Sequence, residues 1–365
     1  MTIEHRGQVD RSEIEDHRKQ PQAWADRLGI SREAIDLYLA SDVIDLHVDT
    51  FIWTRVLGYD LRRRHGRGLF GGRFYSQVDL PRMLEAQVSG AIWSITTNPL
   101  RSARSRAETF SENLAQLRAI IDSVGAHAEL VASAADYARA RASGKHAVFI
   151  GIQGGNALDL EPAALDRLAE HVIRVTLVHL TSSTLGASSS PLAAAGGLGP
   201  RGHEYIEGLN SRRVFLDLAH IGRRSFFEAV RAHDASQPLI VTHTGVSAVR
   251  PSWRNLDDEQ LRAIAATGGV VGVVYHGGYL SGRYFSGGRA SDIARHLVHI
   301  VNTVGPDVAA LGSDWDGMII PPKDMRTCLE LPRLVQALLD AKLEPEIIQN
   351  ILGINFLRAL ARLRP

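Results

Sequence analysis

The sequence predicts an α/β protein in which a closed (β/α)8 TIM barrel follows an N-terminal helical extension. Eight short, apolar and β-branched runs recur along the chain, and helical patterns lie between most of them. Strands that alternate with helices form parallel sheets with crossover helices. Because the runs are apolar throughout, the strands should be buried on both faces, which favours a closed barrel over an open sheet.

The helical extension is expected to cover residues 1–42, and the barrel residues 43–365. Pro21 to Ala40 has a helical pattern. Ser31 is suited to cap the second part of this helix, because a serine hydroxyl accepts a backbone N–H at a helix start.

The expected strands share an apolar, β-branched composition: Val43 to Val48, Ala91 to Ile95, Ala147 to Ile152, Val172 to Val178, Val214 to Leu218, Leu239 to Val241, Val270 to Val274 and Val308 to Leu311. The helical patterns between them are Ala107 to Val124, Ala163 to His171, Ser225 to His233, Asp257 to Thr267 and Ala290 to Val304. This alternation predicts one barrel domain.

Polar side chains follow nearly all of these runs. In TIM barrels such positions lie together at the C-terminal face, where the chemistry takes place. The residues expected there are His47, Asp49, Gln153, His179, His220, His243, His276 and Asp314. A single histidine at a strand end is usually structural, but five histidines and two aspartates at one mouth predict a site for a divalent metal.

Composition excludes several classes of function. The formal net charge is +1, without the basic excess of proteins that bind nucleic acid or membrane surfaces. Cys328 is the only cysteine, so no internal disulfide can form and a reducing compartment is expected. The first twenty residues lack the apolar stretch of a signal peptide, and no run is long enough to cross a bilayer. We therefore expect a cytoplasmic protein without nucleic-acid or membrane partners.

Five ordered motifs resemble those of the membrane (renal) dipeptidase family, in the amidohydrolase superfamily. They are "DLHVDT", "VDLPRMLEAQVSGAIWS", "GLGPRGHEYIEGLNSRRVFLDLAH", "THTGVSAVRPSWRNLDDEQL" and "GSDWDG", and the similarity runs from about Val43 to Leu360. The resemblance implies a barrel of the metal-dependent hydrolase type. It also implies a zinc-dependent enzyme that cleaves dipeptides or dipeptide-like amides by attack of metal-bound hydroxide.

The resemblance also implies roles for single residues. His47 and Asp49 match the ligands of one metal, and His220 and His243 match those of a second. By the same match His179 polarises the substrate carbonyl, and Asp314 shuttles protons beside the metal-bound water and is a weak ligand at most. Arg254 matches the arginine that holds the substrate carboxylate. Its place after the run that delivers His243, with Asp257 suited to cap the next helix, puts Arg254 in a loop at the catalytic face.

Gln153 departs from the family pattern. In the family this position is a glutamate that bridges the two metals, followed by two glycines and a histidine, whereas this chain has Asn156 after the glycines. A neutral amide makes Gln153 a weak ligand or none, so the resemblance implies one or two Zn²⁺ ions with the second bound weakly. His276 stands where human-type members have a tyrosine, and we expect it in the substrate pocket rather than as an extra ligand.

Three loops are candidate parts of the site. "SSTLGASSSPLAAAGGLGPRG" and "SGRYFSGGRAS" are Gly/Ser-rich connections on the catalytic side and are expected to cover the substrate. "LRRRHGRG" is basic and is expected to be a solvated loop, with a clamp for an acidic substrate as the alternative.

Two other functions remain open at this stage. The barrel could have lost hydrolysis and act as a binding or regulatory protein, or it could catalyse a changed reaction such as deamination or lactone opening. The retained His179, Arg254 and Asp314 favour the dipeptidase-like enzyme, acting on a small substrate with a free carboxylate. A homodimer is compatible with the sequence.

Overall fold

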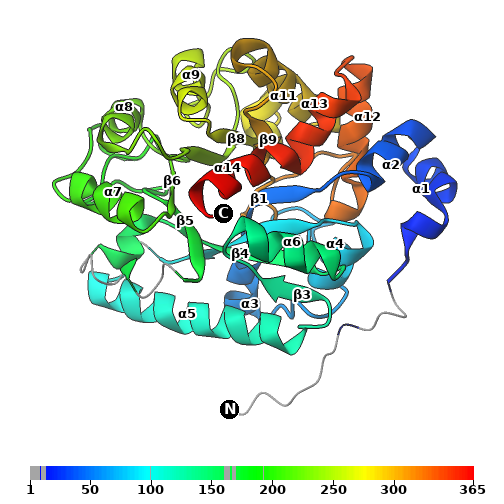
Figure 1. Cartoon of the computed structure of the whole chain (residues 1–365), viewed down its shortest axis with the longest axis horizontal. Helices are drawn as coiled ribbons and strands as arrows, with labels where there is room; N and C mark the ends of the chain where they lie inside the picture. The colour runs from blue at the N-terminus through cyan, green and yellow to red at the C-terminus, as the bar shows by residue number, and fades with distance from the viewer. Residues whose placement is uncertain (1–8, 10–13, 99, 160–164, 167–169, 192) are drawn as a thin grey trace.

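Parallel strands close into a barrel with helices on its outside (Figure 1). The computed structural model describes residues 9, 14–98, 100–159, 165–166, 170–191 and 193–365. Within these residues the barrel strands are β1 (Ile44–Val48), β2 (Gly90–Thr96), β4 (His146–Gln153), β5 (Val172–Thr176), β6 (Phe215–Asp217), β7 (Ile240–Thr244), β8 (Val270–Val273) and β9 (Ala309–Leu311). The barrel closes where β2 pairs in parallel with β4, from Gly90 opposite Ala147 to Thr96 opposite Gln153.

All eight predicted strands are confirmed, with ends that differ by a few residues. A further strand, β3 (Ala128–Leu130), was not predicted. It pairs with the start of β4 outside the barrel, Ala128 opposite His146. Its three residues, one of them charged, are too few for an apolar pattern to reveal.

Four of the predicted helical patterns correspond to α5 (Ala103–Ser123), α8 (Arg223–Ala232), α9 (Asp258–Ala266) and α11 (Ala290–Val304). The fifth, Ala163 to His171, lies mostly outside the described residues. Asp257 caps α9 as predicted, because its side chain accepts the Gln260 N–H. The other α-helices described after β1 are α3 (Phe51–Leu57), α4 (Leu80–Glu85), α6 (Ala134–Ala142), α7 (Gly202–Ser211), α10 (Gly277–Ser281), α12 (Pro332–Asp340), α13 (Pro345–Gln349) and α14 (Asn355–Leu363).

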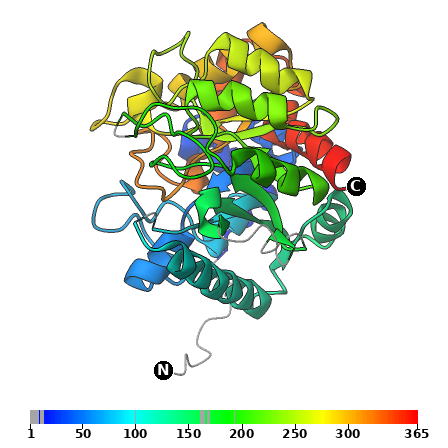
Figure 2. The same cartoon turned by 90° about the vertical axis from the view of Figure 1, so that its left-hand side faces the viewer.

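The last helix, α14, covers one end of the barrel (Figure 1). Its Phe356 packs edge-on against Phe149 of β4, with ring centres 5.5 Å apart, and also contacts Phe215 of β6. In Figure 2 the C-terminus lies on the right and long connections lie on the left. The polar site lies at the carboxyl ends of the strands, so α14 seals the opposite mouth.

The predicted helix from Pro21 to Ala40 is two helices, α1 (Pro21–Leu28) and α2 (Arg32–Leu39). Gly29 ends α1 in the left-handed conformation, with φ of 64°, and Ser31 caps α2 as predicted. Helix α2 packs beside α12 and α13 of the barrel.

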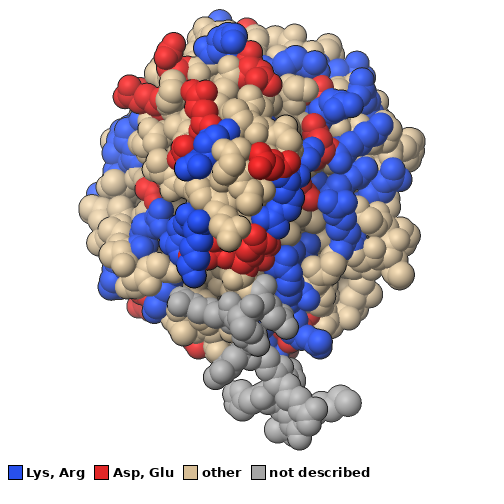
Figure 3. Space-filling model, turned by 90° about the vertical axis from the view of Figure 1, so that its right-hand side faces the viewer, with Lys and Arg blue, Asp and Glu red and all other residues tan. Residues whose placement is uncertain are grey.

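The face that carries the extension has basic and acidic side chains close together (Figure 3). Exposed ion pairs on the extension itself are Arg18–Asp16, Arg27–Glu15 and Arg32–Asp36. Among the helices that the structure describes, none combines the length and the apolar character needed to cross a membrane.

Candidate active site

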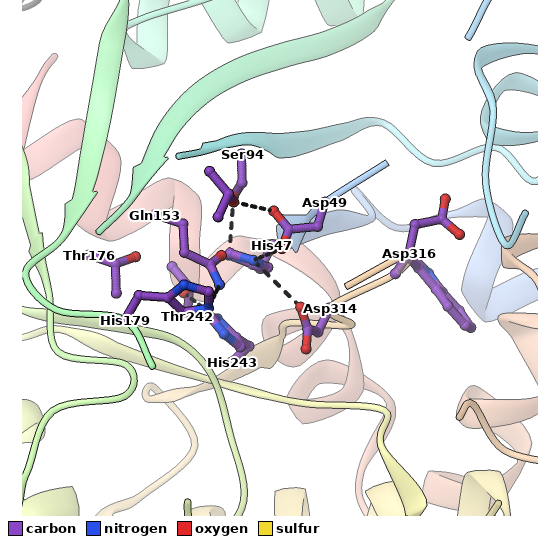
Figure 4. Close-up of polar contacts among 12 residues, drawn as sticks. His47, Asp49, Ser94, Gln153, Thr176, His179, Thr242, His243, Asp314 and Asp316 are labelled. Carbon is purple, nitrogen blue, oxygen red and sulfur yellow. Dashed lines mark hydrogen bonds and ion pairs between the residues drawn. The ribbon is translucent and has the colours of Figure 1, made fainter. Parts of the chain in front are cut away.

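Most of the polar residues predicted from the strand ends come together at the carboxyl ends of the barrel strands (Figure 4). His47, Gln153 and His243 belong to strands β1, β4 and β7. His179, His220 and Asp314 each lie three residues beyond the end of a strand, after β5, β6 and β9. The predicted convergence is therefore confirmed for these positions.

The centre of the group is the buried ring of His47. Its Nε2 lies 3.6 Å from Asp49 Oδ2 and 3.6 Å from Asp314 Oδ1. The ring also stacks on His243, with ring centres 3.8 Å apart. Ligand atoms of His47, His243 and Asp314 all lie within 4.8 Å of one another, a spacing that suits the coordination shell of one cation.

Two further histidines adjoin this group. The Nε2 atoms of His220 and His243 lie 2.8 Å apart, and the rings of His179 and His220 meet edge-on at 4.7 Å. Burial lowers the pKa of His220 and of His243 well below the ordinary value. Both rings are therefore neutral, which is the form that binds metals.

Gln153 joins β4 to His179. Its amide Nε2 donates a hydrogen bond to His179 Nε2 at 2.8 Å. Burial lowers the pKa of His179 to about 4, so the ring is neutral and its proton lies on Nδ1. Gln153 Oε1 and His47 Nε2 are buried and have no hydrogen-bond partner among the described residues. A carbonyl oxygen and an imidazole nitrogen are both able to bind a cation, and a bound cation would remove the cost of leaving these buried atoms without a partner.

The backbone around the site is strained. His220, Asp314, Asp316 and Met318 have φ between 62° and 66°, a region that residues other than glycine rarely adopt. Such strain persists only where the surrounding structure enforces it, and it concentrates at functional sites.

The two aspartates of "GSDWDG" differ in their surroundings. Burial, and then the nearby Asp49, raise the pKa of Asp314 well above the ordinary value. Asp316 instead accepts hydrogen bonds from Thr50 Oγ1 at 2.6 Å and from the Gln77 N–H at 2.8 Å. Asp316 therefore anchors the loop, and Asp314 is the one that faces the group around His47 (Figure 4).

Arg254 is buried next to the group, as its place in the chain predicts. Its Nη2 donates to the backbone oxygen of His243 at 2.6 Å, and only 4% of the residue is exposed. Together with His220 and Trp253 it lines a cavity of about 180 Å³. No carboxylate within the described part of the chain forms an ion pair with Arg254, so this buried cation has its charge available for a ligand.

His276 lies apart from the candidate ligands. Its Nδ1 accepts the Ile320 N–H at 3.0 Å, and its ring packs edge-on against Tyr279 and Tyr284. These hydrogen-bond and ring contacts do not include the candidate ligands His47, Asp49, His243 and Asp314. A place in the substrate pocket stays a prediction.

The basic loop "LRRRHGRG" is held by ion pairs rather than open as a clamp. The pairs are Arg62–Asp60, Arg64–Glu85 and Arg67–Glu330. Three of the four arginines in the loop thus already have carboxylate partners, and the fourth, Arg63, is exposed, which favours the expected solvated loop.

A buried polar layer in contact with His47 was not predicted from the sequence. Its members are Ser94, Arg174, Thr176, Asp217 and Thr242, all fully buried. Arg174 was the available signal, because it is a charged residue inside the apolar run Val172 to Val178.

Comparison with known proteins adds to this geometry. A family model described as "Membrane dipeptidase (Peptidase family M19)" matches residues 31–364. An "Uncharacterized protein in pqqA 5'region" from Klebsiella pneumoniae is 32% identical over 257 residues, covering 68% of this chain and 94% of that protein. "Dipeptidase ataJ" from Aspergillus terreus is 29% identical over 315 residues, covering 78% of this chain and 76% of the relative.

Among solved structures, the chain is similar to a metallo peptidase from Rhodobacter sphaeroides liganded with a phosphinate mimic of the dipeptide L-Ala-D-Ala. The TM-score is 0.76 at 22% identity, and the match covers 88% of this chain and 99% of the other. At this identity the similarity supports the barrel fold.

Proposed function

The chain belongs to the membrane dipeptidase family, peptidase family M19. We propose that it cleaves dipeptides or dipeptide-like amides with a free carboxylate. The observation that carries the proposal is Arg254. This guanidinium is buried beside His243 and lacks a carboxylate partner among the described residues. A planar guanidinium suits bidentate binding of a carboxylate.

The residues of the centre fit a divalent metal. We propose zinc, held by His47, Asp49 and His243 with Asp314 as a weak ligand, because this nitrogen and oxygen set suits Zn²⁺. When bound, the metal supplies Lewis-acid activation of water and of the substrate carbonyl. Gln153 places a neutral amide where the related enzymes are expected to have a bridging carboxylate, so we propose that a second metal binds only weakly.

The other residues have distinct tasks in this proposal. Asp314 accepts the proton of the attacking water and returns it to the leaving amine, and its side chain is 13% exposed. His179 donates a hydrogen bond to the carbonyl oxygen as negative charge develops there. The hydrogen bond from Gln153 makes Nδ1 the protonated nitrogen of this ring, so donation from Nε2 requires that hydrogen bond to break when substrate binds.

That hydrogen bond is also the observation that favours the second candidate function. Because Gln153 already uses His179 Nε2, the barrel could be an impaired dipeptidase that binds its ligand without cleaving it. A changed reaction, such as deamination or lactone opening, would use the same centre.

A panel of dipeptides, assayed with zinc-loaded protein, tests the proposal. Each dipeptide is paired with its C-terminal amide. We expect hydrolysis of the free acids and little of the amides. Tight binding without turnover would favour the binding protein, and turnover of lactones or amino-heterocycles alone would favour the changed reaction.

A further inference from the structure

Arg174 of β5 is a fully buried cation in contact with the candidate metal ligand His47. Its guanidinium uses all four of its terminal N–H groups. Nη1 donates to the Ile152 backbone oxygen at 3.0 Å and to Thr176 Oγ1 at 2.7 Å. Nη2 donates to Ser94 Oγ at 2.6 Å and to His47 Nδ1 at 3.0 Å.

The surroundings hold this guanidinium in place. Asp217 Oδ2 lies 3.6 Å from Arg174 Nη1, and both residues are fully buried. Gly151 leaves the space that the guanidinium fills, because a Cβ at this glycine would lie 2.7 Å from Arg174 Cζ. Arg174 thus has one well-defined position next to His47.

The contact with His47 determines which ring nitrogen carries the proton. A guanidinium is only a donor, so His47 Nδ1 must be an acceptor. In a neutral imidazole the proton then lies on Nε2, the atom that faces Asp49 and Asp314. A histidine that binds a metal normally shows the opposite arrangement, donating its second N–H to a carboxylate, a carbonyl or water.

We propose that Arg174 is a positioning residue that weakens metal binding at this centre, by placing a fixed positive charge and a hydrogen-bond donor against His47. Before a metal can bind His47 Nε2, the proton on that nitrogen must either leave for solvent or move to Nδ1. Loss to solvent makes the ring an imidazolate, and a proton on Nδ1 breaks the hydrogen bond from Arg174. The centre is therefore set to exchange its metal rather than to hold it permanently. The inference rests on the proposed function only in that His47 is taken as a ligand.

Metal affinity, measured without substrate, tests the proposal. The apparent Kd for Zn²⁺ is determined by competition with a chromophoric chelator for the parent protein and for Arg174→Met and Arg174→Lys. Arg174→Met removes the charge at similar length and should bind zinc at least about 10-fold more tightly, the scale of effects from partners of metal ligands. Arg174→Lys keeps a cation there and should stay near the parent value.

A matched control is Arg82→Met, which removes another buried arginine, one paired with Asp79 and not in contact with the candidate ligands. It should leave zinc affinity unchanged. Equal or weaker binding in Arg174→Met than in the parent would overturn the proposal, as would equal tightening in Arg174→Lys.

A second measurement uses the parent protein and is independent of how the variants fold. In metal-depleted protein with ¹⁵N-labelled histidine, long-range ¹H–¹⁵N spectra should place the proton of His47 on Nε2. A proton on Nδ1 is incompatible with the Arg174 contact and would refute the inference. Neither readout depends on peptide hydrolysis, so failure of the proposed function would leave both outcomes interpretable.

Discussion

Replacing Arg254 by methionine tests the assignment of the substrate carboxylate most directly. The residue is 4% exposed, and among the described residues its guanidinium has one hydrogen-bond partner, the His243 backbone oxygen. A bound carboxylate would therefore be its main ionic partner. Removing one partner of a buried charge pair costs about 2–5 kcal/mol, or about 30-fold to several-thousand-fold in affinity. Since the contact holds substrate and transition state alike, the loss should appear in KM rather than in kcat.

The assay compares a dipeptide with its C-terminal amide in the parent protein and in Arg254→Met. KM should rise for the acid and remain nearly constant for the amide, with unchanged zinc content. A suitable control is Arg223→Met, because Arg223 lines the same cavity but is exposed and paired with Asp257. If KM rises equally for the acid and the amide, or if the variant loses its metal, Arg254 does not hold the carboxylate.

Three further changes probe the metal, the core and the pH dependence. Gln153→Glu should retain more zinc after dialysis than the parent protein, as measured by elemental analysis. An unchanged zinc content would contradict the proposal that the second metal is weak because position 153 lacks a bridging carboxylate. Phe356→Ala should lower the free energy of unfolding by about 3–5 kcal/mol in urea titrations, because it opens a cavity where α14 packs on the barrel; a loss below about 1 kcal/mol would argue against that packing. Burial lowers the pKa of His146 to about 4, against about 6.5 in the unfolded chain. The contribution of the neutral ring to the free energy of unfolding is therefore complete above pH 6.5 and is lost as the pH falls toward 4. The stability of His146→Gln should therefore fall less steeply than that of the parent protein over this pH range. An identical fall in both proteins would refute the lowered pKa of His146.

The fold was largely predictable because each barrel strand is buried on both faces and so appears as an apolar run. The exceptions have local causes. The break between α1 and α2 was visible in Gly29 followed by Ser31, which is the pattern of a helix end and a new start. Strand β3 depends on pairing with β4 rather than on its own three residues.

The site was predictable as a set of residues but not as a set of contacts. Strand order places His47, His243 and Asp314 at one mouth, since the carboxyl ends of parallel strands meet there. The side chains that pack against these three residues are determined by the register between neighbouring strands. For example, the register of β4 and β5 places Gly151 opposite Arg174. That register is a tertiary property, so the contact of Arg174 with His47 could not be read from either segment alone.

The charges around the centre explain why two substitutions should act together. Asp45, Asp49, Asp217 and Asp314 interact electrostatically with the two buried arginines, Arg174 and Arg254, or with each other. When all four carboxylates are ionised, the four aspartates and two arginines together have a net charge of about −2. One divalent ion balances this charge, whereas two divalent ions would leave an excess of positive charge. Gln153→Glu and Arg174→Met each add one negative charge to this balance, so the double variant would match two divalent ions. We expect it to retain two zinc equivalents through dialysis, with each single variant retaining fewer. If the double variant holds no more zinc than the parent, geometry rather than charge limits this centre to one metal.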